Sequence, residues 1–429
     1  MNAFRFLHCA DLHLDTPFKG MSAVPDAIRQ AIKNSTFAAL QNVTQIALSE
    51  NVDFVLIAGD LFDAAERSLR AQLFLRRELE KLSAAGIFVC IVHGNHDPEN
   101  GGKAELAWPE RVHFFSSDKP ETLRLPNRRG QDAALVTGMS YGQKAVTENL
   151  AERFIPADSA LYKIALLHAN VDGDPAHDNY APCSLSTLKQ SGFDYWALGH
   201  IHARKVLHKQ PYAVYPGNIQ GRSVRELGPK GCYVANVTEL GETSLTFHET
   251  DAIRFFCAEI PLDTLATEQD LQDELQRRMA DIREQAEGRH AVVRFCFSGR
   301  TPLYRKLRNP TFLPDLLAEL RGEEERAFTE SNLPFVWIES VDDESAPPVD
   351  LAALARQDDF IAVMLQHVDK LLNDRGELAA FGHAALQPLF TSKAATYAAE
   401  PDEQTLRKWL AEARNLAVEA LIRDAGWET

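Results

Sequence analysis

The chain has 429 residues and a formal net charge of −16, with the apolar and charged content of an ordinary globular protein. This length allows two or three domains, at least one of them with a large core. The negative charge argues against a protein that coats nucleic acid by bulk attraction. There is no apolar run long enough for a membrane span, no signal-peptide pattern and no CxxC pair, so we expect a cytoplasmic protein that does not contact a membrane.

Short apolar runs alternate with longer amphipathic stretches over the first 200 residues. The apolar runs predict buried strands at residues 4–10, 54–58, 87–92, 164–167 and 195–198. The amphipathic stretches predict helices at residues 26–50 and 65–85. Strands that alternate with helices indicate βαβ units and a sheet covered by helices on both faces.

The pattern then changes twice. Residues 205–250 contain short alternating strands with Gly and Pro turns, which are typical of an antiparallel layer. A small βαβαβ domain follows, with its strands and helices predicted at residues 253–260, 266–286, 291–297, 311–322 and 335–341. The acidic stretch "SVDDESAPPVD" contains two prolines and is interpreted as a linker.

The last part of the chain, residues 351–429, is predicted to be helical. Its final helix carries one apolar stripe, made of Leu406, Trp409, Leu410, Ala413, Leu416, Ala417 and Leu421. This stripe packs either on the same chain or on a partner helix. The predicted organisation is therefore a first domain, a second domain, a linker and a helical segment, at residues 1–250, 251–341, 342–350 and 351–429.

Polar side chains follow each predicted strand of the first domain. The five strand ends read Asp11-Leu12-His13, Gly59-Asp60, Gly94-Asn95-His96-Asp97, His168, and Gly199-His200-Ile201-His202. Ligand sites of open α/β sheets lie outside the carboxyl ends of the strands, so these side chains are expected to meet in one crevice. Carboxylate, amide oxygen and imidazole together suit a divalent cation, and the lack of Cys argues against a closed structural zinc site.

Other polar features have plainer interpretations. A lone histidine is more often a hydrogen-bonded structural residue than a ligand, and this applies to His8, His93, His113 and His208. Two basic runs, residues 204–230 and 289–308, contain six Arg or Lys each, with Glu226 as the single acid. Either run lines a phosphate-binding groove or forms a solvated surface.

The ordered set of motifs resembles the calcineurin-like metallophosphoesterases. The wording "HCADLHLDTPF", "GDLFD", "GNHD", and "GHIH" followed by "YPGN" is similar to the SbcD-type DNA repair exonucleases, particularly their YhaO-like branch. The resemblance is strong over residues 1–250 and extends to about residue 341. It implies an α/β metallophosphoesterase sandwich of sheets flanked by helices, then a small βαβαβ capping domain and a helical C-terminal segment.

The resemblance also implies a site with two divalent ions. One ion would be held by Asp11, His13, Asp60 and His202, and the other by Asp60, Asn95, His168 and His200. His96 would stabilise the transition state or protonate the leaving oxygen, with Asp97 holding its second ring nitrogen. The alternative for Asp97 is a carboxylate that caps the turn. Mixed oxygen and nitrogen donors suit Mn²⁺, while Fe²⁺, Zn²⁺ and Mg²⁺ stay open.

The implied function is 3′-to-5′ exonuclease action on DNA. The chain has no GxxxxGK[ST] motif, so the resemblance implies an SMC-like ATPase partner of SbcC type, gripped by residues 351–429, and a homodimer through the first domain. Two alternatives remain: a phosphodiesterase or phosphatase for small nucleotides, and a non-catalytic module that tethers DNA ends. A scaffold does not need a complete ligand set, which argues against the second alternative.

Overall fold

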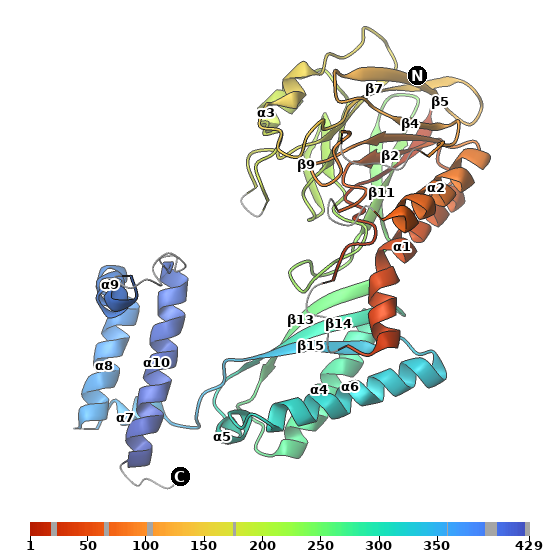
Figure 1. Cartoon of the computed structure of the whole chain (residues 1–429). Helices are drawn as coiled ribbons and strands as arrows, with labels where there is room; N and C mark the ends of the chain where they lie inside the picture. The colour runs from red at the N-terminus through yellow and green to blue at the C-terminus, as the bar shows by residue number, and fades with distance from the viewer. Residues whose placement is uncertain are drawn as a thin grey trace. The chain divides into compact units, whose positions relative to one another are not determined.

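The computed structural model describes residues 1–18, 24–63, 68–100, 106–174, 177–357, 359–390 and 401–424 (Figure 1). The chain divides into two compact units. The first unit comprises Met1–Ala258, Arg278–Arg294 and Leu320–Ser340, and the second comprises Glu259–Arg277, Phe295–Glu319 and Val341–Thr429. The domain boundaries expected from the sequence, near residues 250 and 341, stay a prediction.

The first sheet has six strands in the order β12-β11-β1-β2-β3-β4. Strands β1 to β4 are parallel, whereas β11 and β12 continue the sheet antiparallel. The first three predicted strands are confirmed as β1, β2 and β3. The bounds of the six strands are β1 Phe4–Cys9, β2 Phe54–Ala58, β3 Phe88–Val92, β4 Val112–Phe114, β11 Gly231–Val237 and β12 Thr243–Glu249.

A second six-stranded sheet has the order β5-β6-β7-β8-β10-β9. It contains the last two predicted strands, so the expectation of one sheet covered on both faces by helices was wrong. The short strands expected in residues 205–250 exist, but they divide between the two sheets. The bounds are β5 Glu121–Pro126, β6 Asp132–Met139, β7 Tyr162–His168, β8 Tyr195–Gly199, β9 Lys205–Lys209 and β10 Tyr212–Tyr215.

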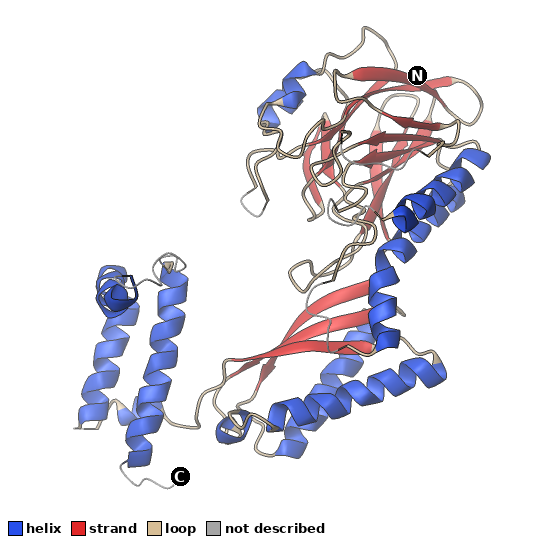
Figure 2. Ribbon diagram, viewed as in Figure 1, coloured by secondary structure: helices blue, strands red, loops and turns tan. Residues whose placement is uncertain are grey.

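The side chains of β2 show how the layers are built. Phe54 and Leu56 belong to a core that the two sheets share, while Val55 and Ile57 pack on the opposite face with helices α1 (Asp26–Ser49) and α2 (Leu69–Ala84). These two helices lie side by side (Figure 2). A strand buried on both faces is apolar at every position, which explains why these strands were visible in the sequence. The result is the metallophosphoesterase sandwich of sheets flanked by helices.

A three-stranded sheet in the order β13-β14-β15 follows, with the alternation of strands and helices that the sequence predicted. Helix α6 continues about nine residues beyond its predicted end, because the stretch after Gly322 is rich in Glu and Arg, which favour helix. The prediction stopped earlier because this stretch has no apolar stripe. The bounds are β13 Ile253–Pro261, α4 Glu268–Gln285, β14 His290–Ser298, α5 Tyr304–Leu307, α6 Phe312–Ser331 and β15 Val336–Asp343.

The described residues of the C-terminal segment are mainly helical, as predicted, while residues 358, 391–400 and 425–429 of that prediction lie outside the described residues. On its last helix Leu410 is buried against α8 and α9, whereas Trp409 and Leu416 are exposed, so the apolar stripe packs only in part on its own chain. Of the helices that the structure describes, none is both long and apolar enough to cross a membrane. The bounds are α7 Leu351–Leu354, α8 Phe360–Asn373, α9 Arg375–Phe390 and α10 Glu403–Asp424.

Candidate metal centre

The polar ends of five strands meet at one edge of the sandwich. The backbone N–H of His13 donates to the carbonyl of Asp60 at 3.0 Å, which joins the ends of β1 and β2. The backbone N–H of His200, just after β8, donates to Asp11 Oδ1 at 3.0 Å and so joins the second sheet to the first. Strands of the same direction carry their carboxyl ends to the same edge, so the convergence expected from the sequence is present.

Four of the predicted ligands have a backbone conformation that L-residues rarely adopt. The φ angle is 52° at Asp11, 42° at His13, 52° at Asp60 and 102° at His200. A conformation of this kind costs about 1–3 kcal/mol per residue and persists only where the surrounding structure imposes it. The fold therefore holds these backbones against their own preference, and this directs their side chains inward.

Two glycines leave room for the same side chains. A Cβ atom at Gly94 would overlap Asp60 Oδ1 and lie 2.8 Å from His168 Cε1. A Cβ atom at Gly199 would overlap the carbonyl oxygen of Ala58. Only glycine permits this approach of one strand end to the next.

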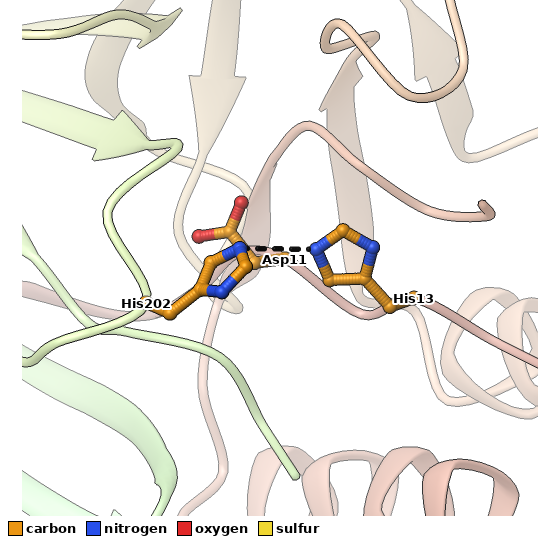
Figure 3. Close-up of side chains that lie close together, drawn as sticks. All are labelled: Asp11, His13 and His202. Carbon is orange, nitrogen blue, oxygen red and sulfur yellow. Dashed lines mark hydrogen bonds between the residues drawn. The ribbon is translucent and has the colours of Figure 1, made fainter. Parts of the chain in front are cut away.

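The first group of potential ligands comprises Asp11, His13 and His202, which offer atoms within 4.8 Å of one another. His13 Nδ1 lies 3.0 Å from Asp63 and His202 Nδ1 lies 2.8 Å from Glu226. An ionised carboxylate accepts only, so both rings carry their proton on Nδ1. The two Nε2 lone pairs therefore face each other at 3.2 Å (Figure 3). A cation between them would replace this repulsion by two bonds.

The second group comprises Asp11, Asp60 and His168. His168 Nδ1 donates to the carbonyl of Ala58 at 2.9 Å, and His200 Nε2 donates to the carbonyl of Asp178 at 2.7 Å. The other ring nitrogens of these two histidines face Asn95 Oδ1. His168 Nε2 lies 2.9 Å from this oxygen and His200 Nδ1 lies 3.2 Å from it. Lone pairs of nitrogen and oxygen converge here as well.

Asp60 belongs to the second group and lies next to the first, while Asp11 belongs to both. Its Oδ1 accepts from the backbone N–H of His96 at 2.9 Å, which leaves Oδ2 to face the interior. Oδ2 is 3.8 Å from His13 Nε2 and 3.5 Å from His168 Nε2. This placement suits a carboxylate shared by two ions, although ligation by the seven predicted residues stays a prediction.

The electrostatics of the site favour a bound cation. Burial raises the pKa of Asp11 well above its ordinary value, and burial raises that of Asp60 to about 6. Burial lowers the pKa of His168, His200 and His202 to about 4, so these imidazoles stay neutral at pH 7. Neutral imidazoles do not balance the charge of the buried carboxylates, and divalent cations would add positive charge to that of Arg222 and His96.

We expect Mn²⁺ affinity to fall as the pH falls through about 6. A proton competes with the cation for Asp60, whose pKa is about 6, whereas the three histidines with a pKa of about 4 stay neutral in this range. Calorimetric titration of metal-free protein at about pH 7.5 and about pH 5.5 measures the difference, together with the protons released. Equal affinity and equal proton release at both values would contradict this expectation.

The predicted partner of His96 was wrong. Asp63, not Asp97, contacts its ring, with Asp63 Oδ1 at 2.9 Å from His96 Nδ1. Burial lowers the pKa of His96, but the hydrogen bond to Asp63 and the charges of Asp60 and Asp63 outweigh burial and raise it overall. Asp97 instead accepts from the backbone N–H groups of Leu61 and Gly94, so it is the turn-capping carboxylate of the alternative interpretation.

Three residues of the centre were missed in the sequence. Asp63 closes the quoted motif "GDLFD", where only Asp60 was given a role. Glu226 was noted only as the single acid of a basic run, and Arg222 only as one of its cations.

In the described chain the four histidines set aside as structural belong to neither group of ligands. Each has a hydrogen-bond partner outside these groups: Tyr195 for His8, Asp97 for His93, Glu121 for His113 and Pro211 for His208.

Comparisons with known proteins agree with this geometry. The family model described as calcineurin-like phosphoesterase matches residues 4–204, and that of the metallophosphoesterase YhaO middle domain matches residues 255–346. The metallophosphoesterase YhaO of Bacillus subtilis is 37% identical over 369 residues, which cover 85% of this chain and 87% of that protein.

More distant relatives match the first part of the chain. The DNA double-strand break repair protein Mre11 of Sulfurisphaera tokodaii is 29% identical over 216 residues, 48% of this chain and 51% of that protein. Mre11 of Aeropyrum pernix is 29% identical over 243 residues, 53% of this chain and 56% of that protein. The chain thus spans about half the length of these two relatives but most of YhaO. The chain belongs to the calcineurin-like metallophosphoesterases, a family of metal-dependent phosphoesterases.

Proposed function

We propose that the chain is a two-metal phosphodiester hydrolase that acts on DNA ends, as SbcD-type exonucleases do. The observation that carries this proposal is the arrangement of His13, His168, His200 and His202. Each histidine has one ring nitrogen bonded to an acceptor, while its other nitrogen faces the shared interior. Mixed nitrogen and oxygen donors suit Mn²⁺, which we propose as the metal.

Different residues of the chain have different roles in hydrolysis: some would bind the metal ions, and His96 would donate a proton. The residues of the two groups would hold two divalent cations, which when bound would lower the pKa of water toward neutrality and stabilise charge on the phosphoryl oxygens. The Nδ1–H group of His96 donates a hydrogen bond to Asp63, and this bond sets the direction in which Nε2 points. The imidazolium protonates the leaving oxygen from Nε2, and the backbone bond from His96 to Asp60 fixes its distance from the centre.

DNA is proposed as substrate because of the family relation. The relatives in Sulfurisphaera and Aeropyrum are DNA double-strand break repair proteins by name. Charge alone gives less support, because cations of the run 289–308 are paired with acids of the same chain. The pairs are Arg294 with Glu339, Lys306 with Glu268, and Arg308 with Asp343.

The experiment that tests this proposal follows nucleotides released from labelled linear duplex DNA in the presence of Mn²⁺. We expect release from the 3′ end, abolished by a chelator, and no release from a covalently closed circle of the same sequence. A small phosphodiester and a free nucleotide are assayed beside the DNA. The three possible functions differ in these assays.

Two outcomes would contradict the proposal. Rapid hydrolysis of the small substrates with intact linear DNA would indicate the small-nucleotide phosphodiesterase or phosphatase. Binding of DNA ends without any metal-dependent hydrolysis would indicate the tethering module.

We also propose that residues 351–429 contact an SMC-like ATPase, and that the first domain forms a homodimer. The support for an ATPase contact is the apolar surface of this segment. Phe360 and Val363 on α8 and Trp409 and Leu416 on α10 are exposed, although such side chains are usually buried.

A further inference from the structure

The histidines of the two proposed ions are held by different kinds of acceptor. His168 and His200 donate to backbone carbonyl groups, whose position is fixed by the chain itself. His13 and His202 donate to the carboxylates of Asp63 and Glu226, which sit on rotatable side chains. The ion that His13 and His202 would hold therefore depends on something that fixes these two carboxylates.

Arg222 lies between the two carboxylates. Its Nη1 is 3.7 Å from Asp63 Oδ1, and its Nη2 is 3.3 Å from Glu226 Oε1. Its backbone N–H also donates to Glu226 Oε2 at 2.8 Å. Nη2 is 3.1 Å from His202 Nδ1, but that nitrogen uses its own proton to bond Glu226, so the carboxylates are the partners of the guanidinium.

The environment strengthens these contacts. The side chains of Asp63, Glu226 and Arg222 are 13%, 15% and 21% exposed, so water screens their charges little. A planar guanidinium has donors in a fixed fork, so one Arg spans two acceptors that a Lys reaches only one at a time.

We propose that Arg222 is a positioning residue that fixes Asp63 and Glu226, and thereby orients His13 and His202 toward one of the two metal ions. This inference rests on the proposed two-metal centre. The other ion, whose histidines are held by backbone carbonyls, does not depend on Arg222. Loss of the guanidinium therefore affects the two ions unequally.

The test is a titration of Mn²⁺ alone into metal-free Arg222→Gln protein. We expect one ion to bind with wild-type affinity and the other to bind more weakly, by up to the about 10–100-fold that removing a direct partner of a metal ligand costs. The ion that is retained also reports that the variant has folded. The matched control is Arg225→Gln, which removes the same charge three residues away from an exposed position and should bind both ions normally.

Further variants identify which of the two ions is weakened and provide a test if Arg222→Gln does not fold. In an Asn95→Ala background the remaining ion is the one near His13 and His202, and adding Arg222→Gln should then abolish binding. If Arg222→Gln does not fold, Arg222→Lys carries the test, with a smaller loss of affinity for the same ion.

Two results would overturn the inference. One is unchanged affinity for both ions in Arg222→Gln, including the case in which only the KM for the phosphoester rises, which would make Arg222 a substrate contact. The other is equal weakening of both ions in a folded Arg222→Gln or Arg222→Lys protein. A wild-type protein that binds fewer than two ions would instead overturn the two-metal proposal.

Discussion

Replacing Asp60 by Asn is expected to remove metal-dependent hydrolysis almost completely. Asp60 Oδ1 accepts from the backbone of His96, so the amide oxygen of Asn would take this place and its NH₂ group would face His13 and His168. An NH₂ group has no lone pair for a cation. Loss of both ions removes several kcal/mol of transition-state stabilisation, a fall in kcat of about 10³-fold or more.

Metal content and turnover are measured on the same Asp60→Asn preparation. The matched control is Asp53→Asn, because Asp53 is also a buried carboxylate that accepts from backbone N–H groups, those of Arg5 and Arg128, but precedes β2 instead of following it. The folded control protein should keep both ions. An Asp60→Asn protein that still holds two ions would refute the shared carboxylate.

Replacing His96 by Asn is expected to lower kcat by about 10²–10⁴-fold, the usual contribution of a positioned proton donor, while both ions stay bound. The ring of His96 contacts Asp63, and its backbone N–H donates to Asp60 Oδ1, but its side chain is not one of the seven predicted ligands. Elemental analysis of the metal and steady-state kinetics on DNA separate the two effects.

A histidine in a similar setting provides the control. His113 has a side chain that is 36% exposed, as His96 has, and pairs with the carboxylate of Glu121. His113→Asn should therefore leave kcat unchanged. Equal activity of His96→Asn and wild type would remove His96 from the mechanism, whereas loss of the ions would make it a ligand or a support for one.

In the first sheet and its neighbour, the strands that were predicted individually are mainly those whose residues face an apolar environment on both sides. Strands β2, β3 and β8 read as continuous apolar runs, and β1 and β7 are interrupted only by Arg5, His8 and Lys163, so the polar ends stand out against them. The division into two sheets was not predictable in this way, because an apolar run shows that a strand is buried but not which strand it pairs with. Strand β5 alternates exposed and partly buried residues, so its run was too weak to notice.

The site shows the same limit. Asp97 was assigned to His96 because the two residues are neighbours in the chain, but its carboxylate turns back to the N–H groups of Leu61 and Gly94. Asp63 is 33 positions away from His96 in the sequence and yet touches it. Residues that orient ligands gain their role from tertiary placement, so motif spacing does not indicate them.

The most direct measurement is anomalous diffraction from crystals of the protein grown with Mn²⁺. We predict two peaks a few Å apart, with Asp60 between them, one beside His13 and His202 and the other beside His168 and His200. Absence of both peaks from this site, or a single ion bound elsewhere, would contradict the proposal that this cluster is a two-metal hydrolytic centre.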